Sequence, residues 1–219
     1  MRKLLPLMVL LCLGCSFGSG NLQSKHSTDI EARRIRRIAI LPPAGTRGAP
    51  APKTPLGTAP DPRSGEREAA EHLARSVHSA MAALPNWQIV SESEMREVEQ
   101  SLGATSELDR LRRLGEMVYA DAVISGRIQR YRERVGDEWG AKSPASVAFV
   151  LDLVDARRGD VIWQASFDET QKSLSENIFA IGDIGERGIR WLTADQLAEE
   201  GVKKAIGQLH EIIARTPVR

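Results

Sequence analysis

The stretch VAFVLDLVDARRGDVIWQASF, residues 147–167, contains two runs in which apolar side chains alternate with other residues. Alternation predicts β-strands, because successive side chains of a strand point to opposite faces of a sheet. Between the two runs, residues 157–160 read Arg-Arg-Gly-Asp, which is typical of a tight turn. The stretch therefore predicts an antiparallel hairpin.

The rest of the chain predicts further strands and four helices. Residues 122–135 begin apolar and end in RYRERV, which predicts a third strand of the same meander with its far end in solvent. Residues 36–41 predict a buried strand and residues 87–90 a short one. Four segments show helical spacing of apolar residues, and they begin near Ser64, Ser91, Ser106 and Thr193.

This order of elements predicts an α/β fold. Strands that alternate first with helices and then with turns make a mixed, mostly antiparallel sheet of about five strands flanked by helices. We expect a single α/β domain over residues 34–214. Residues 42–62 hold seven prolines and three glycines, which predicts a long loop that is either a solvated insertion or a binding element.

The amino-terminal residues are typical of a targeting signal. Arg2 and Lys3 precede an apolar run of ten residues over 4–13, whereas a membrane-spanning helix needs about 20. A short run with a basic head indicates a secretory signal peptide, which we place at residues 1–14. Gly14 and Cys15 follow the run directly.

A small residue before a cysteine after an apolar run resembles the lipobox of bacterial lipoproteins, although Cys12 stands where leucine is usual. The resemblance implies cleavage between Gly14 and Cys15 and a diacylglycerol on the Cys15 thiol. Ser16, in place of the aspartate that marks inner-membrane retention, implies the periplasmic face of the outer membrane. Residues 15–33 then form a lipidated flexible tether. The alternatives are an ordinary signal peptide cleaved elsewhere and a short membrane anchor.

Composition and spacing argue against several chemistries. With 30 Lys and Arg against 29 Asp and Glu, the chain lacks the basic excess of a nucleic-acid binder, and we expect no nucleic-acid partner. The four histidines show no metal-ligand spacing, no G-x-S-x-G motif occurs, and both cysteines lie within the first fifteen residues. Asp152 is expected to pair with an arginine such as Arg127. We therefore expect no metal, no cofactor and no catalytic residues.

Two further segments could serve binding. Candidate protein-binding residues gather where the third strand of the meander ends, and they are Arg130, Tyr131, Arg132, Arg134 and Trp139. Tyr, Trp and Arg are enriched at interface hot spots, but such a charge run is also typical of a solvated hairpin tip. Gly182, Gly185 and Gly188 recur every third residue, which predicts a flexible connection, a hinge or a docking loop.

Three stretches together resemble a known superfamily. They are RIAILPP at 37–43, ADAVISGRIQRY at 120–131 and the hairpin at 147–167. The chain resembles the superfamily that includes the curli-secretion lipoprotein CsgG, the penicillin-binding-protein activator LpoB and the amino-terminal domain of TolB. The resemblance implies a fold like the TolB amino-terminal domain, no catalytic residues, and an accessory or assembly role in the cell envelope.

The sequence thus favours a non-enzymatic lipoprotein that is anchored to the outer membrane and binds another envelope protein. A homo-oligomeric subunit, associated with assembly or with a secretion channel, is the alternative. An enzyme that acts on cell wall or lipid is a third hypothesis, and it requires a concave pocket with convergent polar groups.

Overall fold

The computed structural model describes residues 21–43, 62–101, 106–138, 140–171 and 191–214. The predicted signal peptide, Cys15, most of the 42–62 loop, Trp139 and the segment with Gly182, Gly185 and Gly188 lie outside these ranges. Among the described residues, none of the helices combines the length and the apolar character needed to cross a membrane.

A six-stranded mixed sheet forms the centre of the molecule, with the strand order β1-β8-β7-β4-β2-β3. Its strands are β1 (Leu22–His26), β2 (Arg37–Ile40), β3 (Gln88–Ile89), β4 (Ala122–Arg132), β7 (Ser146–Asp155) and β8 (Val161–Thr170). The pairs β1–β8, β8–β7 and β7–β4 are antiparallel, whereas β2 is parallel to both β4 and β3. The predicted fold class and meander are confirmed, with six strands in place of about five.

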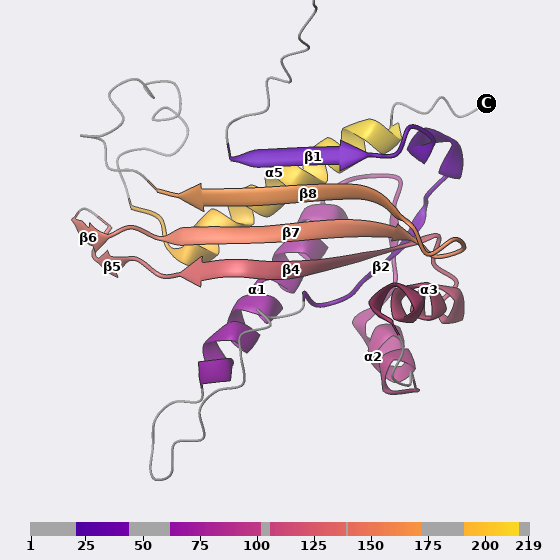
Figure 1. Ribbon diagram of the computed structural model, residues 1–219, viewed down its shortest axis with the longest axis horizontal. Coiled ribbons are helices and arrows are strands. Elements are labelled where there is room, and N and C mark those ends of the chain that lie inside the picture. Colours follow the sequence, from indigo (N-terminus) through magenta and orange to yellow (C-terminus); the bar gives the residue numbers. More distant parts are fainter. Residues whose placement is uncertain (1–20, 44–61, 102–105, 139, 172–190, 215–219) are drawn as a thin grey trace, which may run out of the picture.

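Helices cover both faces of the sheet, but unequally. Helices α1 (Pro62–Ala82) and α5 (Ala194–Ala214) cross one face side by side, while α2 (Glu92–Ser101) and α3 (Glu107–Met117) pack at the end where β4 begins (Figure 1). The opposite face over β1, β8, β7 and the second half of β4 carries no described helix (Figure 1). We call this surface the open sheet face.

The predicted helix starts carry the hydrogen bonds that their sequences indicate. Ser91 Oγ accepts the N–H of Glu94 at 3.4 Å, and the Ser91 N–H donates to the Glu94 carboxylate at 3.2 Å. Thr193 and Gln196 make the same reciprocal pair at the start of α5, at 3.2 and 3.0 Å. These capping boxes satisfy backbone N–H groups that have no partner inside a helix.

The main core lies between the sheet and the pair α1 and α5. Its largest fully buried side chains include Trp163, Phe149 and Phe167, and the rings of Phe149 and Phe167 stack with centroids 5.1 Å apart. Helix α5 approaches closely at Gly201, where an added Cβ would come within 2.7 Å of the Phe167 ring. A second, smaller core fills the space under α2 and α3.

Residues 22–33 differ from the flexible tether that the sequence predicted. Leu22 to His26 form the edge strand β1 on β8, and Ile30–Arg33 form a short 3-10 helix. Leu22 is buried in the main core, and Ser24 Oγ donates to Gln208 of α5 at 2.9 Å. The four other residues of β1 are exposed and polar, so the strand lacks the apolar alternation by which strands are recognised.

The third predicted strand also ends earlier than expected. Strand β4 stops at Arg132, and β5 (Val135–Gly136) then pairs with β6 (Ala141–Ser143) in a separate two-stranded sheet. A bulge between Ile128 and Arg130 shifts the register against β7 by one residue. Because a one-residue shift moves each following side chain to the other face, Tyr131 faces the main core and Arg130 faces away from it.

Candidate functional site

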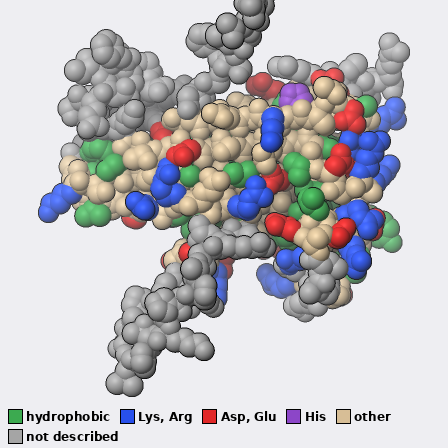
Figure 2. Space-filling view, viewed as in Figure 1, with side chains coloured by type: hydrophobic (Ala, Val, Ile, Leu, Met, Phe, Trp, Pro, Cys, Tyr) green, Lys and Arg blue, Asp and Glu red, His purple; other side chains and the backbone are tan. Residues whose placement is uncertain are grey.

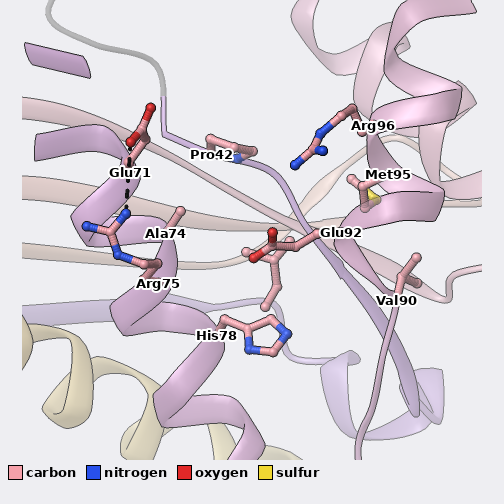
Figure 3. Close-up of a pocket in the computed structure, with 10 residues that line it drawn as sticks. Pro42, Glu71, Ala74, Arg75, His78, Val90, Glu92, Met95 and Arg96 are labelled. Carbon is pink, nitrogen blue, oxygen red and sulfur yellow. Dashed lines mark ion pairs between the residues drawn. The ribbon is translucent and has the colours of Figure 1, made fainter. Parts of the chain in front are cut away.

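A groove of about 440 Å³ lies between α1 and α2, where β2 ends. β2 is parallel to its neighbours β3 and β4, and Ile40 at its carboxyl end lines the groove together with residues of α1 and α2. Clefts outside the carboxyl ends of parallel strands are common binding sites in α/β proteins. The groove residues in Figure 3 are Ile40, Pro42, Glu71, Ala74, Arg75, His78, Val90, Glu92, Met95 and Arg96.

The groove has an apolar floor and a charged rim. Val90 and Met95 are buried beneath it, and Ile40 is half-buried. On the α1 side, Arg75 lies 3.9 Å from Glu71, and both side chains are more than half exposed. Charges of both signs beside apolar surface suit a peptide segment rather than a single ion. Among the described residues, no group of three His, Cys, Asp or Glu side chains could hold a metal.

The α2 side of the rim repeats the charge pattern of α1. Glu92 and Arg96 are one helical turn apart, and both side chains are exposed. Figure 3 shows that Arg96 and Glu71 border opposite sides of the groove and that His78 points toward Glu92. These residues were not among the sequence predictions, because they come from three separate segments. The available signal was the Glu–Arg spacing of four residues on each helix.

The candidate protein-binding residues on β4 are divided by the structure. Arg130 donates to Ser146 Oγ at 2.6 Å and forms an ion pair with Asp168 of β8. Arg134 donates to the backbone carbonyl of Trp191. Both side chains therefore bind residues of the chain itself. Arg132 is exposed.

Tyr131 connects three elements beneath this end of β4. Its hydroxyl donates to the Asp195 carboxylate of α5 and lies 3.4 Å from Nδ1 of His72 on α1. Burial, followed by the hydrogen bond to Asp195, raises the pKa of Tyr131 above its ordinary value of 10.0. The phenol is protonated at neutral pH and donates its hydrogen bond to Asp195.

The open sheet face carries hydrogen bonds and ion pairs that cross its strands. Asp152 of β7 pairs with Arg127 of β4 at 3.2 Å, as the sequence predicted, and accepts a hydrogen bond from Gln164 of β8. The Asp152 side chain is 7% exposed. Figure 2 shows basic and acidic side chains distributed along this face without a hollow that would enclose a substrate. Both carboxylate oxygens of Asp152 therefore have partners on neighbouring strands.

A third polar cluster, which the sequence analysis missed, joins the amino-terminal arm to the turn between β7 and β8. Arg33 binds Asp29 at 2.9 Å, Asp155 at 2.7 Å and Asp160 at 3.0 Å. Burial alone would raise the pKa of Asp155, but the hydrogen bonds from Arg33 and from two backbone N–H groups outweigh it and hold that pKa below its ordinary value. The sequence signal for this cluster was the pair of acidic residues at the predicted turn, Asp155 just before it and Asp160 at its end.

No family model and no curated protein matches the chain. Several solved structures do. The PelC dodecamer from Paraburkholderia phytofirmans aligns at a TM-score of 0.44 and 14% identity, over 86% of this chain and 95% of that one. Lipoprotein GNA1162 from Neisseria meningitidis aligns at 0.39 and 19%, over 69% and 91%. The LpoB C-terminal domain from Escherichia coli aligns at 0.39 and 14%, over 62% and 83%. Similarity at this level implies neither a shared activity nor a shared partner.

Proposed function

We propose that this protein is a non-enzymatic lipoprotein, anchored by Cys15 to the periplasmic face of the outer membrane, that binds another protein of the cell envelope. The observation that carries the proposal is the apolar run that ends in Gly14-Cys15. Acyl chains contribute about 0.8 kcal/mol per buried CH₂, so two or more hold a protein stably at a bilayer. The body supplies a binding surface and no evident reactive centre among its described residues.

The groove between α1 and α2 is the surface that we assign to the partner. In the sheet, β1 lies at one edge and β2 is the fifth strand across, so four strand spacings of about 4.8 Å, about 19 Å in all, separate them. The anchor enters through β1, at the edge far from the groove. The groove therefore lies at a distance from the attachment point, where a partner in the periplasm can reach it.

The chemistry of the groove defines the occupant. Its floor accepts one or two apolar side chains, and its rim offers Glu71, Arg75, Glu92 and Arg96 to charges of either sign. We assign to it a segment of the partner protein in which an apolar side chain stands between charged ones. Rim charges of this kind chiefly set the association rate and the choice of partner.

Site-specific crosslinking in membranes tests this assignment. A photo-crosslinking residue at Arg96 should capture one envelope protein, and Arg75→Glu in the same chain should reduce the capture several-fold. Lys203 on α5 is the control position for the photo-crosslinking residue. Like Arg75, Lys203 forms an ion pair with a glutamate one helical turn away, Glu199, and its side chain is 65% exposed, against 64% for Arg75. Equal capture from position 203, or capture that Arg75→Glu leaves unchanged, would contradict the proposal.

Self-assembly remains the alternative. An exposed apolar edge strand would favour it, but the edge strand β1 presents four exposed polar residues, Gln23, Ser24, Lys25 and His26. Light scattering on the lipidated protein in detergent separates the two hypotheses. The binding-module proposal expects a monomer, and a large, stable ring would favour the assembly subunit.

A further inference from the structure

Given the lipid on Cys15 that the proposed function assumes, the folded body of the protein lies close to its own membrane anchor. The carbonyl of Asn21 accepts the N–H of Asp168 at 2.9 Å, and β1 begins at the next residue. Asn21 lies six positions after Cys15. A fully extended chain covers at most about 3.3–3.6 Å per residue, so Asn21 lies within about 22 Å of the lipidated cysteine. The start of β1 is therefore held within that distance of the membrane surface.

The register of the sheet identifies which end of the body this is. Leu22 pairs with Phe167, and β8 ends three residues later at Thr170, which is about 10 Å along the strand. Thr170 pairs with Ser146 of β7, and Ser146 pairs with Arg132 at the end of β4. Figure 1 shows the start of β1, the end of β4 and the β5–β6 pair at the same end of the molecule.

The side chains at this end suit a lipid headgroup layer. Arg132 and Lys142 are exposed, and Val135 is one of the few large hydrophobic side chains on the described surface, at 57% exposed. Figure 2 shows Lys, Arg and hydrophobic side chains gathered at this left tip, over β5 and β6. Of the acidic groups here, Glu133 and Asp137 are exposed and Glu138 is half-buried, and Glu133 accepts from the backbone N–H of Ala194 at 3.0 Å.

We propose that this membrane-facing end, defined by Arg132, Val135 and Lys142, lies on the headgroup layer of the bilayer that holds the Cys15 lipid. The two cations contact lipid phosphates, and Val135 contacts the interface. A short tether together with a surface contact fixes the orientation of the body. Ile40 of the groove pairs with Ile124 of β4, eight positions before Arg132, so the groove lies about 25 Å along the sheet from this end.

The cysteine content of the chain allows a direct test. After cleavage Cys15 is the only cysteine, and its thiol carries lipid, so one added cysteine accepts one probe. The lipidated protein is placed in vesicles of phosphatidylethanolamine and phosphatidylglycerol that contain a nitroxide on a fraction of the headgroups. A fluorescent probe is attached at Val135→Cys or, as control, at Arg157→Cys, whose side chain is 85% exposed in the turn at the other end of β7.

We expect strong quenching of the probe at position 135 and little at position 157. The double variant Arg132→Glu, Lys142→Glu should reduce the quenching at 135 several-fold, whereas Lys203→Glu, Lys204→Glu on α5 should not. Equal quenching at both positions, or none at 135, would overturn the inference. Mass spectrometry of the same sample first establishes the lipid on Cys15. A sample without lipid refutes the proposed function itself, whereas a lipidated sample without differential quenching refutes only this orientation.

Discussion

Arg33 Nη1 lies 2.7 Å from Asp155 Oδ2, an ion pair between residues 122 positions apart. The two side chains are only 8% and 10% exposed. The contact joins the amino-terminal arm, which includes β1 and the 3-10 helix, to the end of β7. Because the arm is held in this way, it belongs to the folded body, and the chain between body and anchor is short.

Loss of this ion pair should destabilise the protein strongly. Arg33→Met leaves the buried Asp155 carboxylate without its main partner, and breaking a buried pair costs on the order of 3–5 kcal/mol. Urea denaturation measures the change in the free energy of unfolding. Arg158→Met is the control, because Arg158 is 67% exposed and lies 3.6 Å from the half-exposed Asp29, so its loss should cost under about 1 kcal/mol. Equal effects would mean that the Arg33 cluster does not hold the arm.

Acid should weaken the same cluster. The pKa of Asp155 in the folded protein is below its ordinary value of 3.8. Its contribution to stability is therefore fully present above pH 3.8 and is lost as the pH falls through the lower pKa of the folded state. We expect the free energy of unfolding, measured in urea between pH 6 and pH 2.5, to decline in this acid range. Asp155→Asn should show a shallower decline, and an unchanged slope would contradict the assignment.

Two glycines of α5 should respond to alanine with opposite signs. At Gly201 an added Cβ would lie 2.7 Å from the Phe167 ring, so Gly201→Ala should destabilise by about 1–3 kcal/mol through overpacking. At Gly207 no atom lies within 4 Å of the added Cβ, so Gly207→Ala should stabilise the helix by about 0.5–1 kcal/mol. Thermal unfolding of both variants measures the contrast. A stabilising Gly201→Ala would show that α5 does not pack on Phe167 in this way.

Two adjacent residues at the end of β4, Tyr131 and Arg132, should differ in how much they contribute to stability. Tyr131→Phe removes the hydroxyl that donates to Asp195, and such a hydrogen bond contributes about 1 kcal/mol to stability. Arg132→Ala changes an exposed side chain and should leave the unfolding free energy within about 0.5 kcal/mol of the parent. Denaturant titration of both variants measures the difference. A larger loss in Arg132→Ala would contradict the membrane-facing role of Arg132.

Much of the fold could be predicted from local sequence patterns. Alternating apolar residues indicated β7 and β8, and the pairs Ser91–Glu94 and Thr193–Gln196 marked helix starts. These signals are local, since a strand or a cap depends on residues within a few positions of each other. The Arg127–Asp152 pair also followed from adjacent strands with opposite charges on one face.

The remainder depended on contacts that no local pattern encodes. Strand β1 buries one large apolar residue, Leu22, so only its pairing with β8 distinguishes it from a tether. The bulge after Ile128 reverses the alternation and turns Tyr131 into the core, which a regular strand pattern would not indicate. The groove brings together Ile40, Arg75 and Met95, which only the folded chain places side by side.

The central claim is that Cys15 carries the lipid that holds this body at a membrane. Mass spectrometry of the mature amino-terminal peptide, from protein purified out of the membrane fraction, tests it most directly. We expect the peptide to begin at Cys15 and to carry a diacylglyceryl group on the thiol. A peptide that retains Met1, or one that begins elsewhere with an unmodified Cys15, would contradict the anchor, the orientation and the proposed function together.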